Sequence, residues 1–331
     1  MHMQTPDAEK IGVVYKKNLG HYDVLHNNKI TTCTPSAMLW KELTDDLQMN
    51  SGRVETLVME KQMDPIAVGD RVRFTHVLDG GGMILEVLPR RNYLARASAK
   101  PMPGAHAFEQ VISANLDQVV PVFAAANPTP RWHLLDRILV TAESYELPSQ
   151  IVITKSDLVL GGPEEEELHE TAERYRRIGY PVLLTSSVTG EGLETLHKAL
   201  NGQTSALVGK SGVGKTSLLN RLEPGLGLRV KAVNATTGKG RHTTSHLEMF
   251  PLADGGAIVD TPGVREFGIV GLEPEDLAFF FPEIAPLIGR CRFGMSCQHD
   301  EEPGCAVKAA VMDGSVSPYR YKSYLQLCAD M

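Results

Sequence analysis

The sequence has no apolar run near the roughly 20 residues that a membrane-spanning helix requires. It shows no basic segment followed by an apolar one at Met1, so we expect no secretory leader. Positive charge is not in excess either. The net charge is -7, and residues 1–100 carry 13 Lys and Arg against 12 Asp and Glu. Composition alone therefore predicts neither a membrane protein nor a nucleic-acid-binding protein.

Cysteine is scarce, with five in 331 residues. Cys33 and Cys328 resemble ordinary core or helix residues. Four potential metal ligands lie within fifteen residues of one another: Cys291, Cys297, His299 and Cys305. This clustering favours a metal over disulfides and fits a reducing cytoplasm. A Cys3His set is typical of a closed, structural Zn2+ site; the alternative is buried thiols beside a surface histidine.

The strongest motif is a glycine-rich segment between an apolar strand at 206–208 and a helix that begins near Ser217. It consists of Gly209, Lys210, Ser211, Gly212, Val213, Gly214, Lys215, Thr216 and Ser217. The two-glycine spacing before Lys215 and Thr216 matches the P-loop pattern, in which backbone N–H groups hold phosphates. Lys215 can reach the β- and γ-phosphates, and the Thr216 hydroxyl can ligate Mg2+. A glycine-rich turn without a ligand is the alternative, but the strand and helix around it favour a nucleoside triphosphate site.

Asp260 follows the apolar pair Ile258-Val259, as expected of the aspartate that holds Mg2+ directly or through water. Gly263, in Asp-Thr-Pro-Gly, can offer its N–H to a γ-phosphate. Together with the phosphate loop, these residues predict a magnesium-dependent nucleotide site in an α/β domain with a mostly parallel sheet.

Two polar turns at the ends of other strands resemble base-recognition elements. Thr154-Lys155-Ser156-Asp157 follows one strand, and Ser186-Ser187 follows the next. A carboxylate at Asp157 can accept the N1–H and N2–H2 groups of guanine, whereas adenine has no donor at N1. The Lys155 stem can lie across the base, and Ser186 and Ser187 can present backbone N–H groups to the guanine oxygen. By itself Thr154 to Asp157 is more often a helix cap, but with the phosphate loop it favours GTP over ATP.

The order of these motifs is unusual because the base-recognition turns precede the phosphate loop. GTPases usually have the opposite order, so the sequence resembles a circularly permuted GTPase. We therefore expect three domains: an OB-like β-barrel at 1–97, a permuted GTPase domain at 98–270 and a helical zinc-binding domain at 271–331. The barrel prediction rests on short alternating strands at 11–15, 21–25, 53–58, 71–74 and 83–88 with a partly helical insertion at about 35–50; another small β-barrel or an SH3-like module is the alternative. In the α/β domain we expect strands at 118–123 and 150–153 and a helix at 193–200, and we expect a terminal helix at 319–327.

A barrel, a permuted GTPase and a Cys/His module in this order resemble the ribosome small-subunit-dependent GTPase family, RsgA (also YjeQ). The resemblance rests on Gly209–Thr216, Gly240–Thr244, Asp260–Gly263 with Arg265-Glu266-Phe267, and the four metal ligands. It implies a cytoplasmic, monomeric GTPase that uses GTP, Mg2+ and one structural Zn2+. It also implies binding to the small ribosomal subunit and its rRNA late in maturation, with hydrolysis stimulated by that subunit.

Three features differ from what the resemblance leads us to expect. Thr154 stands where most GTPases have Asn, which leaves Asp157 as the main base-recognising residue. Five residues separate Cys291 from Cys297, one more than expected, and the N-terminal region is barely basic.

For the reaction, Val264 stands where many GTPases keep a water-orienting glutamine, so the water must be positioned otherwise. His242 is our candidate; its alternative role is a loop histidine facing RNA or solvent. Thr243 or Thr244, in the switch segment that we expect near residues 234–244, is the predicted switch ligand of Mg2+. Lys215, Thr216 and Asp260 complete the predicted catalytic set. Two other functions remain open: an RNA-binding module with a passive guanine-nucleotide switch and negligible turnover, and an ATP-using kinase.

Overall fold

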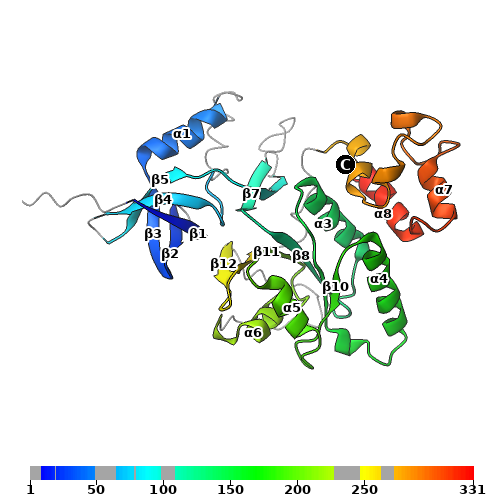
Figure 1. Cartoon of the computed structure of the whole chain (residues 1–331), viewed down its shortest axis with the longest axis horizontal. Coiled ribbons are helices and arrows are strands. Elements are labelled where there is room, and N and C mark those ends of the chain that lie inside the picture. Colours follow the sequence, from blue (N-terminus) through cyan, green and yellow to red (C-terminus); the bar gives the residue numbers. More distant parts are fainter. Residues whose placement is uncertain are drawn as a thin grey trace, which may run out of the picture. The chain divides into compact units, whose positions relative to one another are not determined.

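The structure is a computed structural model that describes residues 9–18, 20–48, 65–77, 80–97, 109–226, 247–261 and 272–331 (Figure 1). The described residues form two compact units. One lies within 1–117, 200–206 and 242–262, and the other within 118–199, 207–241 and 263–331. The domain limits expected at residues 97 and 270 adjoin or fall within segments outside the described residues, and they stay predictions.

The first unit contains a five-stranded barrel. Its strands are β1 (Lys10–Asn18), β2 (His21–His26), β3 (Lys29–Pro35), β4 (Arg71–His76) and β5 (Gly82–Val87). They pair in the order β1-β2-β3-β5-β4, and β4 closes the barrel onto β1. Only β3 and β5 run parallel; the other neighbouring pairs run antiparallel. This Greek-key closure confirms the OB-like prediction. Helix α1 (Ala37–Gln48) is the expected helical insertion. The strand predicted at 53–58 lies outside the described residues.

Alternating side chains fill the barrel. Val14, Tyr22, Val24, Phe74 and Ile84 are fully buried, as the period of two along a strand requires. At Gly12, a Cβ atom would lie 2.4 Å from Val24 Cγ1 and 2.9 Å from the Leu25 carbonyl oxygen. This position of β1 therefore admits only glycine without a shift of β2.

Four further strands belong wholly to the first unit. β6 (Tyr93–Ala97) and β7 (Glu109–Ala114) pair antiparallel, as do β12 (Glu248–Pro251) and β13 (Ala257–Thr261). β12 also pairs with the barrel strand β1, where Lys16 lies opposite Glu248 and forms a 3.1 Å ion pair with it. β13 is the predicted strand that leads into Asp260.

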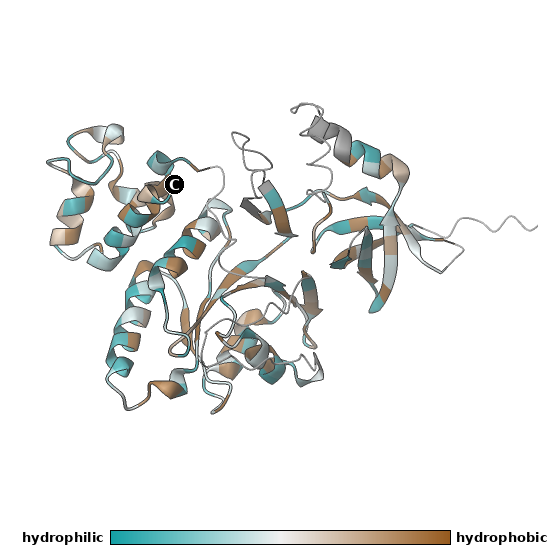
Figure 2. Ribbon diagram, turned by 180° about the vertical axis from the view of Figure 1, so that it is seen from behind, coloured by the Kyte–Doolittle hydropathy of each residue, from teal (hydrophilic) through white to brown (hydrophobic). Residues whose placement is uncertain are grey.

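The second unit has a parallel sheet in which β10 (Val182–Leu184), β9 (Ile151–Thr154) and β8 (Gln118–Ala124) are neighbours in that order. Helix α3 (Trp132–Ser144) packs on β8, and α4 (Glu164–Ile178) packs on β10. α5 (Leu193–Leu200) leads to β11 (Thr204–Val208), which precedes the glycine-rich loop and α6 (Lys215–Leu222). In Figure 2 the strands of this sheet are mostly brown and the helices carry teal faces, because the sheet is buried and each helix has a solvent side.

The C-terminal part of this unit has short helices: η4 (Pro274–Phe280), η5 (Ala285–Leu287), η6 (Gly294–Ser296), α7 (Ala306–Met312) and α8 (Pro318–Ala329). Its apolar core includes Phe281, Val307 and Leu327, and it also takes in Val140 from α3. The cysteine-containing region therefore shares a core with helix α3 of the α/β part of this unit. Across the parts of the chain that the structure describes, every helix is too short or too polar to cross a membrane.

Arg320 of α8 is the largest fully buried side chain in the described residues, at 1% exposure. It donates to Asp136 of α3 over 2.5 Å and to both oxygens of Glu283 over 2.6 and 3.2 Å. The Tyr175 hydroxyl of α4 donates to the same Asp136 oxygen over 2.8 Å. Burial works to lower the pKa of Arg320, but Asp136 and Glu283 more than reverse this effect and the pKa is raised. A buried ionic network thus joins α3, α4 and α8.

Candidate nucleotide site and metal centre

The turn after β9 is fastened to the glycine-rich loop by Thr154. This side chain is buried, and its hydroxyl is within hydrogen-bond distance of the Phe123 carbonyl at 3.1 Å and of the Val213 carbonyl. Phe123 belongs to the neighbouring strand β8, and Val213 belongs to the glycine-rich loop. The end of β9 and the predicted phosphate loop are therefore in direct contact, as expected for the carboxyl edge of a parallel sheet.

Lys155 makes a second link. Its backbone adopts the left-handed conformation (φ 59°), and its Nζ donates to the Gly212 carbonyl over 2.8 Å and to the Asn127 carbonyl. Burial lowers the pKa of Lys155, although nearby Asp157 acts in the opposite direction. The amine spans two loops, so its aliphatic stem is held at the edge where a base is expected.

Asp157 and Ser186 come together although they follow different strands. Ser186 Oγ donates to Asp157 Oδ1 over 2.5 Å and accepts hydrogen bonds from the backbone N–H groups of Val188 and Thr189, each at 3.1 Å. Asp157 is half-buried, with one oxygen held by Ser186. Ser187 follows directly and is half-buried. A half-buried carboxylate in a fixed orientation can accept paired N–H donors from a purine edge.

The glycine-rich loop needs its glycines for conformation and for space. Gly212 and Gly214 have φ of 84° and 99°, a region that glycine adopts without strain. A Cβ at Gly209 would lie 2.4 Å from the Val122 carbonyl oxygen of β8. Lys215 begins α6, and its Nζ donates to the Gly209 carbonyl over 2.7 Å, folding the side chain back over the loop. This arrangement places a tight glycine-rich turn at a helix N-terminus, the geometry that the predicted phosphate loop requires.

The other predicted members of the loop follow the same path. Lys210 and Ser211 lie between Gly209 and Gly212, and Thr216 and Ser217 stand in the first turn of α6, half-buried. Asp260 is half-buried in β13 of the first unit, opposite Glu248. His242, Thr243, Thr244 and Gly263 lie outside the described residues, so their roles stay predictions.

Two contacts were not predicted from the sequence. Ser186 is expected to offer its backbone N–H to a base, whereas in the structure this N–H donates to the Glu191 carbonyl over 3.1 Å and the Ser186 hydroxyl orients Asp157. Glu191 accepts a 2.8 Å hydrogen bond from Ser156 Oγ and so links the two turns. Gly192, next to Glu191, has φ of 67°, and a Cβ there would lie 2.1 Å from the Leu184 carbonyl oxygen. The Gly-Glu-Gly sequence at 190–192 signals a tight turn, but nothing local indicates which serine Glu191 meets.

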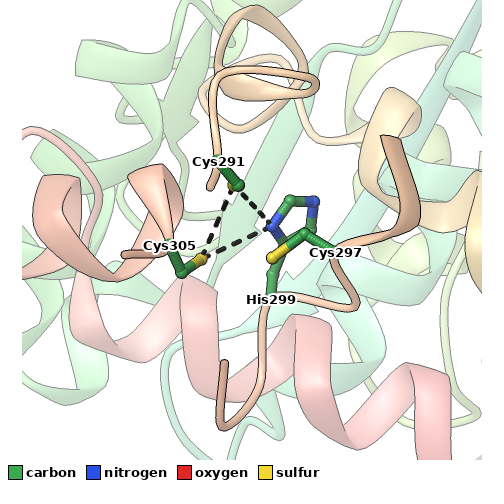
Figure 3. A group of neighbouring side chains, drawn as sticks. All are labelled: Cys291, Cys297, His299 and Cys305. Atoms are coloured by element: carbon green, nitrogen blue, oxygen red, sulfur yellow. Dashed lines mark hydrogen bonds between the residues drawn. The ribbon is translucent and has the colours of Figure 1, made fainter. Parts of the chain in front are cut away.

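The four predicted metal ligands converge in a buried cluster (Figure 3). Their ligand atoms all lie within 4.8 Å of one another. His299 Nδ1 is 3.4 Å from Cys291 Sγ and 3.5 Å from Cys305 Sγ, and these two sulfurs are 3.9 Å apart. A tetrahedral Zn2+ with Zn–S bonds of about 2.3 Å has ligand atoms roughly 3.5–3.8 Å apart. The cluster therefore has both the donor set and the size for zinc.

The surroundings of the cluster also suit a metal. Burial lowers the pKa of His299, which favours the neutral imidazole that binds metals. Burial raises the pKa of the Cys297 thiol to about 12, so without a cation the buried thiolate is unfavourable. The Tyr321 hydroxyl of α8 donates to the His299 carbonyl over 2.6 Å and holds the ligand loop. The longer spacing between Cys291 and Cys297 accommodates η6; Met295 in η6 and Phe293 directly before it are exposed.

Comparison with known proteins gives a consistent result. The family model described as RsgA GTPase matches residues 87–270. Two proteins named "Small ribosomal subunit biogenesis GTPase RsgA" are similar over most of their length. That of Gemmatimonas aurantiaca is 48% identical over 79% of this chain and 83% of its own. That of Moorella thermoacetica is 41% identical over 80% of this chain and 84% of its own.

Two solved structures are also similar. The crystal structure of YjeQ from Thermotoga maritima has a TM-score of 0.72 and 31% identity, with 98% of each chain covered. That of YloQ, described as a circularly permuted GTPase, has a TM-score of 0.68 and 30% identity, with 100% of this chain and 96% of that chain covered.

Proposed function

The chain belongs to the RsgA GTPase family and is a GTP-hydrolysing enzyme, and we propose that it acts in the maturation of the small ribosomal subunit. The observation that supports guanine as the base is the contact between Asp157 and Ser186 at the edge where Thr154 and Lys155 meet the glycine-rich loop. Base recognition and phosphate binding are thereby adjacent, although their motifs occur in reversed order along the chain.

In this proposal the nucleotide phosphates lie in the nest of Gly209 to Gly214, and Lys215 neutralises the β- and γ-phosphate oxygens. Phosphoryl transfer depends on positioning and charge stabilisation more than on covalent chemistry, so a cation at this place lowers the barrier directly. In the structure Lys215 Nζ donates to the Gly209 carbonyl, and it exchanges this acceptor for phosphate when the nucleotide enters.

Thr216 and Asp260 are the proposed Mg2+ ligands, with Thr243 or Thr244 from the switch segment and a hydrogen bond from the Gly263 N–H to the γ-phosphate. Thr216 fits this role because it stands in the first turn of α6 directly after Lys215 and is half-buried. When bound, Mg2+ neutralises charge that develops on the transferred phosphoryl group. His242 is proposed to orient the attacking water.

The Cys3His cluster is proposed to hold one structural Zn2+ through Cys291, Cys297, His299 and Cys305. Four protein ligands complete a tetrahedral shell and leave no position for substrate, so the proposed role of the metal is to fold the C-terminal region, in which all four ligands are buried.

The same region offers a surface suited to rRNA. Arg290, Arg292 and Phe293 flank Cys291 and are exposed, Phe293 at 47%. Unpaired bases stack on aromatic rings and on guanidinium planes, and Arg also contacts phosphates. We propose that this loop and the OB-like barrel contact rRNA of the small subunit, and that the protein works as a monomer in the cytoplasm.

The test is GTP hydrolysis by the full chain with and without purified small ribosomal subunits. We expect a subunit-specific rise of at least about tenfold, because a switch segment ordered by its partner positions the water. Large subunits and free rRNA are the controls. Tight GTP binding without any rise in GTP hydrolysis on addition of small subunits would contradict the proposed partner. Binding to the subunit with negligible turnover would instead favour a passive nucleotide switch.

A further inference from the structure

We propose that Thr154 is a positioning residue that fastens the base-recognition turn to the phosphate loop and makes no contact with the base, so that N7 of the purine is not recognised from this position. The inference deepens the proposed guanine site and rests on it. It concerns the residue at which this sequence differs most clearly from the usual GTPase pattern.

The first step is burial. Thr154 is 1% exposed, so it has almost no surface that a ligand can touch. Asp157, three residues later, is half-buried and keeps surface for a base. A nucleotide that docks at this edge therefore meets Asp157 and not the Thr154 hydroxyl.

The second step is a count of donors. The Thr154 hydroxyl carries one proton, and two backbone carbonyls, those of Phe123 and Val213, lie within hydrogen-bond distance of it. Its only donor is thus committed to the backbone. An asparagine at this place would have two N–H donors and a longer side chain, which is enough to serve a carbonyl and still reach an acceptor on the base.

The third step is the position of the acceptors in the loop. Thr154 bonds the Val213 carbonyl, and Lys155 bonds that of Gly212, so two successive side chains of one turn hold two successive carbonyls of the phosphate loop. A Cβ atom added at Gly214 would lie 3.5 Å from Thr154 Oγ1, so the turn and the loop are in close contact. Thr154 therefore sets the distance between the base-binding and phosphate-binding halves of the site.

These steps leave residue 154 without a hydrogen bond to guanine. In the proposed site Asp157 accepts from N1–H and N2–H2, and the Ser187 backbone N–H donates to O6, because the Ser186 N–H already donates to the Glu191 carbonyl over 3.1 Å. The N7 acceptor of the five-membered ring has no donor from residue 154.

The experiment compares the binding of GDP and 7-deaza-GDP to the full-length protein by calorimetry. Replacing N7 by C–H removes one acceptor and leaves the Asp157 edge intact. We expect the two dissociation constants to agree within about twofold, since no hydrogen bond is lost. A loss of tenfold or more with 7-deaza-GDP would overturn the proposal.

Variants test the fastening role. Thr154→Val keeps the shape and removes the hydroxyl. It should weaken GDP and 7-deaza-GDP equally, by about tenfold, because the Val213 carbonyl loses its partner. Thr154→Ser should restore binding. Thr141→Val is the matched control, since Thr141 is also 1% exposed and its hydroxyl donates to a backbone carbonyl, that of Arg137, within α3.

The outcomes are distinguishable. Wild-type affinity for GDP in Thr154→Val would refute the fastening role. An equal loss of GDP affinity in the control Thr141→Val would also refute it. Equal affinity of the wild type for ADP and GDP would refute the proposed guanine site. In that case a loss of nucleotide affinity in Thr154→Val, but not in Thr141→Val, would still show that residue 154 links the base-recognition turn to the phosphate loop.

Discussion

The Ser186 hydroxyl donates to Asp157 Oδ1 over 2.5 Å, joining the polar turns that follow β10 and β9. Because the same hydroxyl accepts two backbone N–H groups of its own turn, its proton can point only toward the carboxylate. The carboxylate is thereby fixed as an acceptor, which is the state that guanine N–H groups require. In the proposed guanine site, this relationship makes Asp157 the determinant of base choice and Ser186 the residue that orients it.

Asp157→Asn should therefore change the base that is bound. The amide places an N–H2 donor opposite the guanine donors, whereas xanthine has a carbonyl at C2 that can accept from it. Loss of two hydrogen bonds to a charged group, each worth about 1.5–3 kcal/mol, predicts a loss of GDP affinity of roughly 100-fold or more. Calorimetry with GDP and XDP measures both effects.

The serines supply a matched pair for the same measurement. Ser186→Ala should weaken GDP binding about tenfold without favouring XDP, since it removes a hydrogen bond to a carboxylate. Ser187→Ala should have little effect, because only the backbone of Ser187 is proposed to take part. An Asp157→Asn protein that still prefers GDP would show that another group recognises the base.

The elements around the site could be predicted because their signals are local. The helix at 193–200 has the predicted bounds, and the strands predicted at 118–123 and 150–153 agree with the structure to within one residue at each end. Buried parallel strands are continuous apolar runs, and polar turns end them visibly. The Cys3His cluster was likewise predicted, because its ligands lie close together in the sequence.

Features that depend on distant partners could not be predicted. β3 was missed because Lys29–Pro35 is mostly polar and only Cys33 in it is buried. The terminal helix was predicted, but the burial of Arg320 was not, since it depends on Asp136, 184 residues earlier. Thr154 also belongs here: its identity predicts a polar contact, but only the fold shows that the partners are backbone carbonyls.

Zinc should be required for the C-terminal fold. The purified protein is expected to contain one Zn2+ per chain by elemental analysis, and Cys297→Ser should lose it. Since the cluster shares its core with Phe281 and Val140, loss of the metal should also speed hydrogen exchange in α8 and at the end of α3.

Cys328→Ser is the control for the metal site, because Cys328 lies in α8, packed against the same core but outside the cluster. It should keep one Zn2+ and the exchange pattern of the wild type. Full zinc content in Cys297→Ser, with an unchanged pattern, would contradict the ligand assignment.

Arg320→Met should destabilise the second unit strongly. It leaves Asp136 and Glu283 buried without their cation, and breaking a buried pair in this way costs about 3–5 kcal/mol. Urea unfolding followed by far-UV circular dichroism measures the change. Asp330→Ala is the matched control: it removes the partner of Arg137 in a more exposed ion pair, with exposures of 27% and 45%, and should cost at most about 1 kcal/mol. A similar loss of unfolding free energy in both variants would show that the buried network contributes no more to stability than the exposed ion pair does.

His242→Ala tests how the water is positioned. Val264 has no polar atom to replace a water-orienting glutamine, and His242 lies in the predicted switch segment. If its imidazole orients or deprotonates the water, subunit-stimulated kcat should fall by roughly 10²–10⁴-fold, the usual contribution of such a group. GTP affinity should stay unchanged, because His242 is not proposed to touch the base or the β-phosphate. His169→Ala, on the exposed face of α4, should match the wild type. Full stimulated turnover in His242→Ala, with binding intact, would assign the histidine to contact with RNA or solvent and leave the water to another group.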